Sequence, residues 1–502
     1  MNSDGLEGPR CLLNNVDLIS VPADYGRGAN DGAYYPVGLL TIGSHFRRKV
    51  PDVKISVIDL QHEPHFQPRA DVVGISASST LNYRKVLSVA QQAKAAGAIV
   101  VLGGPHVTRL STQVLNNRIG LIDYVVRGNG DSAFASLFEA LQSGSDLHCV
   151  PNLSWRGPQG EIIHNSEFGV SWKYDDFLPL DLSLLRAGVK SYWNTFRTRI
   201  DPTIDAAFVV FSHFGCGYRE MMQQRTGNGK QLSRWCSYCS LNDPLSNRSG
   251  DAIVSEVLGL IRSNGVPRKS NVLLKCYGDN VGTQQAMLRS LASAIERSEE
   301  WAQYNIGWTF YSQSSRVTPE LVNLLCRVGA RNLYIGFDSV DDRIQLLNGL
   351  GTSASTHQRA ARLCYERGIK IQAGFVLGNA GETTESVEKS LRFAEALTTQ
   401  GGLERINSAI IFIIPGSPAY SLLCKQEPWI ESLDELPTEE LQWQWIRHFC
   451  PDLGQSPSEG LAILKQAANK LNQLLEFSPQ ASMGFISNRL AAEVSQQNVF
   501  DK

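Results

Sequence analysis

Three of the ten cysteines stand close enough together in the sequence to act on one metal site. Cys216 is followed after 19 residues by Cys236 and Cys239, which have two residues between them. Thiolates are soft metal ligands, and two kinds of site fit this pattern. With His213 as a fourth ligand the spacing is close to that of a closed, structural zinc site. Three thiolates alone can hold an iron–sulfur cluster and leave one iron open to an exchangeable ligand.

The other seven cysteines are isolated in the sequence. Cys326 and Cys364 lie at apolar helical positions, where a buried thiol packs as a small hydrophobe. Cys276, at the end of an expected strand, is the most plausible substitute if the long spacing removes Cys216 from the metal. The first residues lack the basic and then apolar order of a signal peptide, so we expect a cytoplasmic chain without a disulfide framework.

Small residues also end three expected strands in the first 145 residues. In open parallel sheets, ligands bind outside the carboxyl ends of the strands, where glycine lets the backbone approach the ligand and serine supplies a hydroxyl. These residues therefore predict a ligand site, although each could also be an ordinary turn residue. The candidate residues are Ser76 and Ser78, Gly103 and Gly104, and Gly128 and Gly130.

The elements that position these residues are two series of apolar strands alternating with helical stretches. In residues 1–145 the strand runs have near-continuous apolar cores, which is typical of strands buried on both faces of a parallel sheet. We expect a doubly wound α/β domain there. The expected strands are 16–22, 53–59, 71–76, 98–104 and 124–130.

A second series begins at residue 206 and predicts a partial (βα)6 barrel over 206–424. Catalytic groups of such barrels lie at the carboxyl ends of the strands, and Cys216 directly follows the first of them. Residues 146–205 read as a connector, and residues 425–502 as a helical C-terminal region. The expected barrel strands are 206–212, 271–278, 304–312, 332–339, 370–378 and 407–416.

Composition excludes several classes of protein. The 502 residues are 42% hydrophobic and 19% charged, as in a soluble globular enzyme and unlike a disordered chain. The net charge of -2 provides no broad basic field for nucleic acid. No stretch reaches the 18 or more apolar residues that span a bilayer, so we expect no membrane segment.

The cysteine loop resembles the cluster loop of radical S-adenosylmethionine (SAM) enzymes, in which Gly-Cys is followed by Cys-x-aromatic-Cys. Here these residues are Gly215-Cys216 and Cys236-Ser237-Tyr238-Cys239. Matches in the family's order follow at 333–339, 349–353, 374–383 and 413–418. The usual loop has three residues between the first two cysteines, so about 16 residues, 219–234, are inserted here. The insertion brings Met221 and Met222 near the metal.

The first domain is similar to the cobalamin-binding domain that precedes the barrel in one branch of this family. The matching segments are 36–40, 73–76, 102–106 and 126–130. The family's Asp-x-His-x-x-Gly motif is absent after the first strand, where Asp24 to Gly28 stands instead. We therefore expect no protein histidine on cobalt, and we interpret His62 and His65 as surface or core residues.

The resemblance implies a [4Fe–4S] cluster on Cys216, Cys236 and Cys239, together with SAM and cobalamin as cofactors. It also implies SAM-binding residues on successive strand ends. Tyr238 would lie against the adenine and Asp279 would accept the amino group. Ser312, with Gln313, would reach the methionine carboxylate, and Asp338 would accept the ribose hydroxyls.

The implied activity is methylation of an unactivated carbon or phosphorus centre of a small molecule or peptide, in a biosynthetic pathway. An electron donor such as flavodoxin or ferredoxin would supply the reducing equivalents. One alternative is a cobalamin-dependent radical rearrangement or cyclisation without methyl transfer. Another is a zinc-stabilised binding protein without catalysis.

Overall fold

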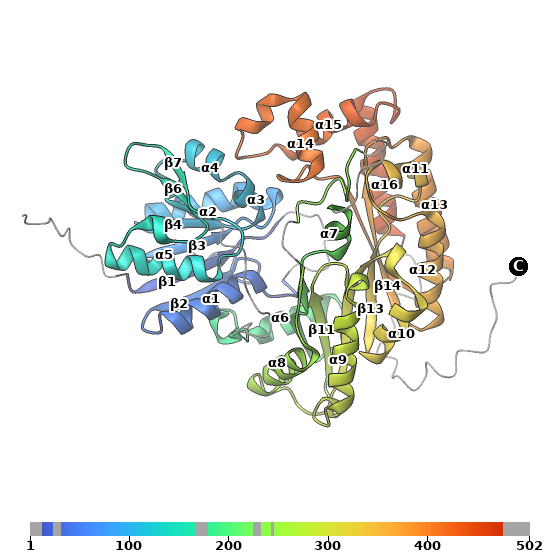
Figure 1. Ribbon diagram of the computed structural model, residues 1–502, viewed down its shortest axis with the longest axis horizontal. Coiled ribbons are helices and arrows are strands. Elements are labelled where there is room, and N and C mark those ends of the chain that lie inside the picture. The colour runs from blue at the N-terminus through green and yellow to red at the C-terminus, as the bar shows by residue number, and fades with distance from the viewer. Residues whose placement is uncertain are drawn as a thin grey trace, which may run out of the picture. The chain divides into compact units, whose positions relative to one another are not determined.

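The chain forms two compact units (Figure 1). The computed structural model describes residues 13–23, 32–166, 179–223, 232–241, 245–400 and 402–474. Unit 1 comprises Met1–Ile200 together with Pro428–Leu436, and unit 2 comprises Asp201–Glu427 and Pro437–Lys502. Within the described residues no helix is long and apolar enough to cross a membrane.

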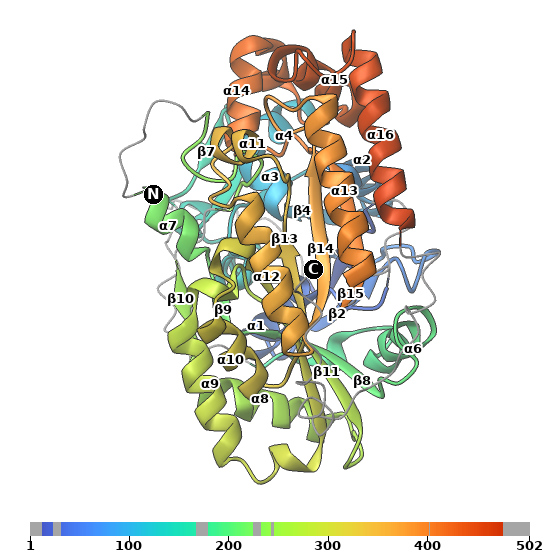
Figure 2. The same ribbon diagram turned by 90° about the vertical axis from the view of Figure 1, so that its right-hand side faces the viewer.

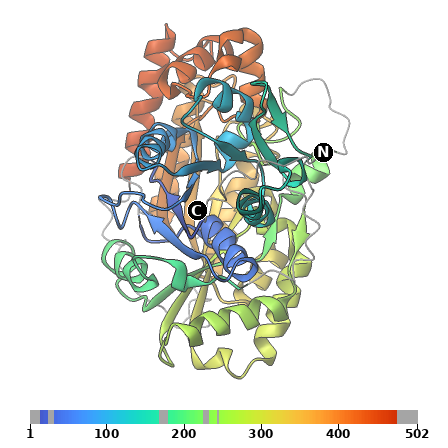
Figure 3. The same cartoon turned by 90° about the vertical axis from the view of Figure 1, so that its left-hand side faces the viewer.

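Unit 1 is built on a seven-stranded sheet of order β2-β1-β3-β4-β5-β6-β7, whose first five strands are parallel. Helices flank this sheet (Figure 3). Apolar side chains are buried along both faces of β3 and β4, which confirms the doubly wound parallel arrangement. The elements are β1 (Asn15–Ser20), α1 (Val37–Lys49), β2 (Lys54–Asp59), β3 (Val72–Ser76), α2 (Tyr83–Ala95), β4 (Ile99–Gly103), α3 (Pro105–Arg109), α4 (Ser111–Asn117), β5 (Tyr124–Val126) and α5 (Asp131–Ser143).

The segment expected to be a connector contributes to unit 1. Strand β6 (Leu153–Arg156) pairs antiparallel with β5, and β7 (Ile162–His164) pairs antiparallel with β6. Helix α6 (Val189–Arg199) buries Tyr192, Trp193 and Phe196. These strands have only four and three residues, too few for a clear apolar period. The structure thus differs here from the sequence interpretation.

Unit 2 is a six-stranded parallel sheet of order β15-β14-β13-β12-β11-β8, which confirms the partial barrel. Figure 2 shows its helices α12 and α13 in front of strands β13 and β14. Its first half contains β8 (Ala206–Phe211), β9 (His213–Phe214), α7 (Gly217–Gln223), β10 (Ser246–Asn247), α8 (Gly250–Ser263), β11 (Asn271–Tyr277), α9 (Gln285–Arg297), β12 (Asn305–Gln313) and α10 (Pro319–Arg327). Its second half contains β13 (Ala330–Gly336), α11 (Asp342–Leu347), α12 (Ala354–Glu366), β14 (Lys370–Leu377), α13 (Thr384–Gln400), β15 (Leu403–Ile410), α14 (Pro418–Gln426), α15 (Thr438–Phe449) and α16 (Pro457–Gln473).

The last barrel strand begins earlier than its apolar run. β15 spans Leu403–Ile410, whereas the apolar pattern placed the strand at 407–416. Glu404, at the polar start of the strand, accepts hydrogen bonds from the side chains of Asn332 and Gln372. Polar pairing along the neighbouring strands therefore extends β15 toward the N-terminus. The strand ends at Ile410, and the amide of Ile411 makes a last hydrogen bond to the carbonyl of Leu377 at 2.7 Å.

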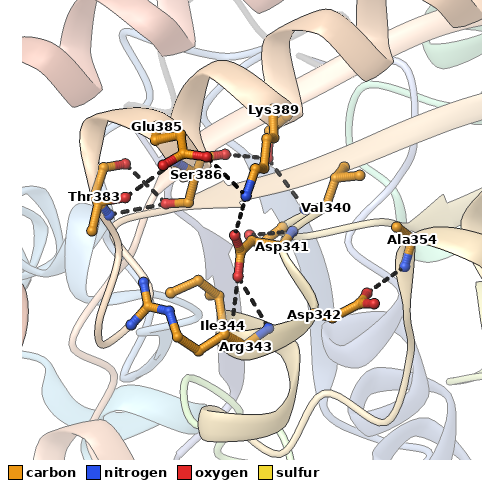
Figure 4. Close-up of polar contacts among 12 residues, drawn as sticks. Val340, Asp341, Asp342, Arg343, Ile344, Ala354, Thr383, Glu385, Ser386 and Lys389 are labelled. Carbon is orange, nitrogen blue, oxygen red and sulfur yellow. Dashed lines mark hydrogen bonds and ion pairs between the residues drawn. The ribbon is translucent and has the colours of Figure 1, made fainter.

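An ion pair links the loop after β13 to helix α13 (Figure 4). Asp341 is the N-cap of α11 and accepts hydrogen bonds from the backbone amides of Arg343 and Ile344, while Lys389 on α13 donates to its other oxygen at 2.9 Å. Burial on its own would raise the pKa of Asp341, but the Lys389 and backbone hydrogen bonds leave it below its usual value. This cap fixes α11 relative to α13 close to Asp338.

A short C-terminal segment belongs to unit 1. Asp434 is buried and accepts hydrogen bonds from the hydroxyl of Tyr83 at 2.9 Å, from Arg118 Nε at 2.6 Å and from Asn117 Nδ2 at 3.1 Å. Its backbone carbonyl lies 2.9 Å from Nε2 of His106. Helices α2, α3 and α4 thus share one buried polar network with residues 428–436.

Candidate cluster and ligand sites

The first cysteine lies in a tight turn at the carboxyl end of the barrel sheet. Gly215 has a φ of 73°, a left-handed conformation that glycine adopts without a steric cost, and it turns the chain from β9 into α7. Cys216 occupies the junction and is partly exposed. The side-chain amide of Asn280, which follows β11, points its Nδ2 at Cys216 Sγ from 4.0 Å.

The other two cysteines lie in a turn that is anchored through the residue between them. Ser237 is fully buried, its backbone amide donates to the carbonyl of Asn348 at 3.1 Å, and its hydroxyl donates to Asn348 Oδ1 at 3.0 Å. The amide of Cys239 donates to the carbonyl of Cys236 at 3.0 Å, which closes the turn.

The three thiols lie near one another. Burial raises the pKa of Cys236 most, and the neighbouring Cys239, Asp338 and Cys216 raise it further. Burial also raises the pKa of Cys239 to about 11, with Cys216 and Asp279 among its electrostatic neighbours. A metal ligand must be deprotonated, so a metal bound by Cys236 and Cys239 would displace their protons against this effect of burial.

The geometry weighs against the zinc alternative. Among the described residues no three His, Cys, Asp or Glu side chains converge on one ion. His213 is fully buried, its Nδ1 lies 2.8 Å from the Ser212 hydroxyl, and its Nε2 contacts the carbonyl of Asp279. Burial lowers its pKa. Both ring nitrogens are already engaged within the protein, whereas each cysteine of a [4Fe–4S] cluster binds a different iron and the thiols need not converge.

Cys276 does not reach the cysteine loop as a ligand. Its thiol is fully buried and lies 2.9 Å from the hydroxyl of Ser212, and burial raises its pKa to about 12. A thiol held in the core beside β8 is a packing residue, so Cys216 stays the better candidate for the first ligand.

Tyr238 and Asp338, both expected to serve SAM, contact each other. The Tyr238 hydroxyl donates to the Asp338 carboxylate. Asp338 is 8% exposed and has a φ of 59°, an uncommon conformation for a residue with a side chain. Burial raises its pKa to about 6, which the Tyr238 hydrogen bond opposes. The structure thus brings the two predicted residues together beside Cys236.

Asp279 and Ser312 lie at the ends of neighbouring strands, and a residue absent from the sequence prediction joins them. Asp279 is exposed, and Ser312 is buried with its hydroxyl 3.1 Å from the carbonyl of Gln313. Asn280, with a φ of 49°, accepts the Gln313 amide at 3.2 Å and the Ser312 hydroxyl at 3.5 Å. The local signal was the Gly-Asp-Asn sequence after a strand, because asparagine tolerates the left-handed conformation.

A cavity of about 570 Å³ lies beside the helix that follows Cys216. Its lining includes Gly217 and Met221 from α7, Thr283 before α9, and Arg316 after β12. Arg316 Nη2 lies 3.7 Å from the Met221 sulfur, while its buried Nε has no hydrogen-bond partner among the described residues. Met221 therefore lines this cavity together with Gly217, the residue after Cys216, and its expected place near the metal stays a prediction. Residues 224–231 of the insertion fall outside the described part of the chain.

In unit 1 the predicted serines and glycines lie at the carboxyl ends of β3, β4 and β5, and we call this set the cradle. Gly104 and Gly130 leave no room for a side chain, whereas a Cβ atom on Gly128 would meet no atom within 4 Å. Gly104 has a φ of 105°, and a Cβ atom there would lie 2.7 Å from the carbonyl oxygen of Ala77. A Cβ atom on Gly130 would lie 2.9 Å from Ile42. Ser76 ends β3, the Ser78 hydroxyl accepts from Asn82 at 3.1 Å, Gly103 accepts the Ala77 amide at 2.8 Å, and the Gly128 amide donates to Thr108 at 3.0 Å.

Because parallel strands end at one edge, this cradle is a surface of bare backbone and hydroxyl groups, which fits the amide-fringed edge and nucleotide tail of a corrinoid. Asp24 to Gly28 lie outside the described residues. His62 Nε2 lies 2.7 Å from the carbonyl of Gly32, and its ring packs 4.1 Å from Tyr192. His65 is exposed. His62 is thus engaged in local packing.

Two family models match the sequence. The B12 binding domain matches residues 30–138 and the Radical SAM superfamily matches residues 233–394. The second match contains Cys236 and Cys239 but begins after Cys216, as an insertion between the first two cysteines would cause.

Curated proteins and a solved structure resemble the chain across both units. An uncharacterized methyltransferase of Pyrococcus horikoshii is 24% identical over 383 residues, covering 72% of this chain and 73% of the relative. The anaerobic magnesium-protoporphyrin IX monomethyl ester cyclase of Rubrivivax gelatinosus is 22% identical over 346 residues, covering 65% of this chain and 54% of the cyclase. The radical SAM methyltransferase TsrM of Kitasatospora setae, solved with cobalamin and a [4Fe–4S] cluster, shares the fold with a TM-score of 0.61 and 16% identity over 83% of this chain and 78% of that one.

Proposed function

The chain belongs to the radical SAM enzymes that carry a cobalamin-binding domain, and we propose that it methylates an unactivated carbon or phosphorus centre of a small molecule or peptide. Its cofactors are cobalamin, SAM and a [4Fe–4S] cluster. When bound, the reduced cluster supplies the electron that cleaves SAM, and cobalamin carries the methyl group. The observation that supports methylation is the match to the P. horikoshii methyltransferase, because it covers more of the chain than either unit contains.

We assign the cluster to Cys216, Cys236 and Cys239. Their shared neighbourhood at the carboxyl ends of the barrel strands supports this assignment. The chain would hold the three thiolates near one another and leave one iron without a protein ligand. Tyr238 and Asp338 would bind the adenosyl part of SAM. The Asp338 carboxylate, which accepts a hydrogen bond from Tyr238 in this structure, would then accept hydrogen bonds from the ribose hydroxyls instead. Asp279 and Ser312 would meet its amino and carboxylate groups.

In unit 1 we assign cobalamin to the cradle of Ser76, Ser78, Gly103, Gly104, Gly128 and Gly130. The position of these residues at the carboxyl ends of neighbouring parallel strands, within the segment matched by the B12 binding domain, supports this assignment. We further propose a flavodoxin or ferredoxin as electron donor and a cytoplasmic location.

The test of this function is the fate of a labelled methyl group. Anaerobically reconstituted protein is incubated with SAM labelled in its methyl group, a reductant and small-molecule extracts of the source cells. Methylation predicts the label in a product whose mass rises by one methyl group. Cys216→Ala, Cys236→Ala or Cys239→Ala should each abolish reductive cleavage of SAM, whereas His213→Ala should retain the cluster iron.

A second candidate is a rearrangement or cyclisation without methyl transfer, which the match to the R. gelatinosus cyclase favours. In that case SAM is cleaved and cobalamin is required, but the product contains no label. Stoichiometric zinc and no acid-labile sulfide in the purified protein would contradict both functions.

A further inference from the structure

The long spacing between Cys216 and Cys236 leaves the cysteine loop without its usual covalent restraint. Three residues between two cysteines keep their thiols close by chain length alone, whereas 19 residues do not. Other contacts must therefore hold Cys216 close to the turn that carries Cys236 and Cys239. Two buried asparagines, Asn280 and Asn348, make such contacts.

Asn280 links Cys216 to the end of β12. Its Nδ2 lies 4.0 Å from Cys216 Sγ and donates to Gln313 Oε1 at 3.1 Å, and its Oδ1 accepts the Gln313 backbone amide at 3.2 Å. Gln313 in turn donates from Nε2 to the carbonyl of Leu350 at 2.7 Å. A chain of amides thus runs from the first cysteine to the loop after α11.

Asn348 links that same loop to the other two cysteines. It accepts the backbone amide and the hydroxyl of Ser237, and it is bound in turn to the amide and carbonyl of Ala380 at 3.0 and 2.9 Å. Close packing reinforces the link, because a Cβ atom on Gly349 would lie 2.5 Å from the carbonyl oxygen of Ser233. The loop of residues 348–350 is therefore the common support of both halves.

We propose that Asn280 and Asn348 are positioning residues that replace the short cysteine loop, and that Asn280 also donates a hydrogen bond to the Cys216 thiolate. This proposal rests on the assignment of the three cysteines to the cluster. Hydrogen bonds to ligand sulfur raise the reduction potential of an iron–sulfur cluster, because the reduced form carries more negative charge. Asn280 thus sets both the place of Cys216 and the ease with which the cluster accepts an electron.

The test uses two variants that keep the left-handed backbone of residue 280. Asn280→Gly removes the whole side chain without strain at a φ of 49°, and Asn280→Asp keeps the oxygen that accepts from Gln313 but replaces the donor beside Cys216. We expect Asn280→Gly to lose iron to a chelator about tenfold faster than the wild type, as is typical when an outer-shell partner is removed. We expect Asn280→Asp to assemble a cluster with a lower midpoint potential in an anaerobic spectroscopic titration.

Asn152→Gly is the matched control. Asn152 is also a buried asparagine in the left-handed conformation, with a φ of 57°, but it lies in unit 1. It should lose similar stability and leave chelator resistance and midpoint potential as in the wild type. Unchanged chelator resistance in Asn280→Gly, or an unchanged potential in Asn280→Asp, would overturn the proposal.

A measurement on the cluster-free protein separates this proposal from the proposed function. Dibromobimane becomes fluorescent when it bridges two neighbouring thiols. In the Cys236→Ala protein it should bridge Cys216 and Cys239, and adding Asn280→Gly or Asn348→Ala should reduce the yield several-fold. If the wild type holds no cluster but the bridging yield falls as expected, the positioning roles of Asn280 and Asn348 are supported and the cluster assignment fails. An equal bridging yield in all of these proteins refutes the positioning roles of Asn280 and Asn348.

Discussion

Replacing Gly104 by alanine tests whether the strand-end cradle of unit 1 binds cobalamin. Its backbone, with φ 105° and ψ 170°, lies in a region that is almost exclusive to glycine, and a side chain there costs about 1–3 kcal/mol. The added Cβ would also lie 2.7 Å from the oxygen and 2.9 Å from the carbon of the Ala77 carbonyl. Because both are backbone atoms, no rotamer change relieves the contact, and we expect unit 1 to lose about 3 kcal/mol of unfolding free energy.

The loss should extend to the cofactor. The loops after β3 and β4 are joined by hydrogen bonds from the Ala77 amide to Gly103 and from the His106 amide to Ala77, at 2.8 and 3.2 Å. Displacement of Gly104 therefore moves both loops. If the substitution destabilises the cobalamin-bound protein by about 1.4 kcal/mol more than the unbound protein, the affinity for cobalamin falls about tenfold.

The assay is retention of hydroxocobalamin through gel filtration, followed by an absorbance titration for Kd, at a temperature where both proteins are folded. Gly97→Ala is the control, because Gly97 precedes the other end of β4, has a φ of 86°, and has no atom within 4 Å of the added Cβ. It should lose stability but keep the wild-type Kd. Equal cobalamin affinity in Gly104→Ala and Gly97→Ala, with Gly104→Ala folded, would refute the cradle.

Three further changes test the supports of the two units. Arg118→Met leaves the buried Asp434 carboxylate without its cation and should lower the stability of unit 1 by about 2–3 kcal/mol, measured by urea unfolding, against Arg109→Met as a control. Asp341→Ala removes the N-cap of α11 and should lower the free energy of unfolding by about 1 kcal/mol at pH 7. Because the pKa of Asp341 is lowered in the folded state, the stability difference between this variant and the wild type should vanish as the pH falls below 4. Burial raises the pKa of Glu382 to about 8, so its carboxyl group lowers the stability of the fold as the pH rises from about 4.5 toward 8. The unfolding free energy of Glu382→Gln should therefore match that of the wild type at pH 5 and exceed it at pH 8. An equal difference in stability at both pH values would contradict this pKa.

The sequence was informative wherever burial imposed a long, uniform pattern. Strands such as β3 and β8 are buried on both faces, so their apolar runs located them within one or two residues. The strand ends then placed Cys216, Ser312 and Asp338 at one edge, because the direction of a parallel strand fixes which of its ends carries the ligand.

Contacts between distant residues could not be predicted in this way. Asn280 and Cys216 are 64 positions apart, and Ser237 and Asn348 are 111 apart, and no local period marks either pair. The same reason hides the partnership of Asp434 with Tyr83. Strands β6 and β7 were missed for a different reason, since four and three residues are too few to distinguish a strand from a turn.

The membership of residues 428–436 in unit 1 has a consequence for anyone dividing this chain. The polypeptide passes between the units at three points, after Ile200, after Glu427 and after Leu436, so a single cut in the middle of the sequence does not yield two complete domains. In a fragment that ends at residue 200, the hydroxyl of Tyr83 and the imidazole of His106 would lose the hydrogen bonds that they make to Asp434 in the full chain. A recombinant cobalamin-binding fragment therefore needs the nonapeptide 428–436, supplied by fusion or in trans, and a nonsense mutation before codon 428 would damage the first domain as well as the last helices.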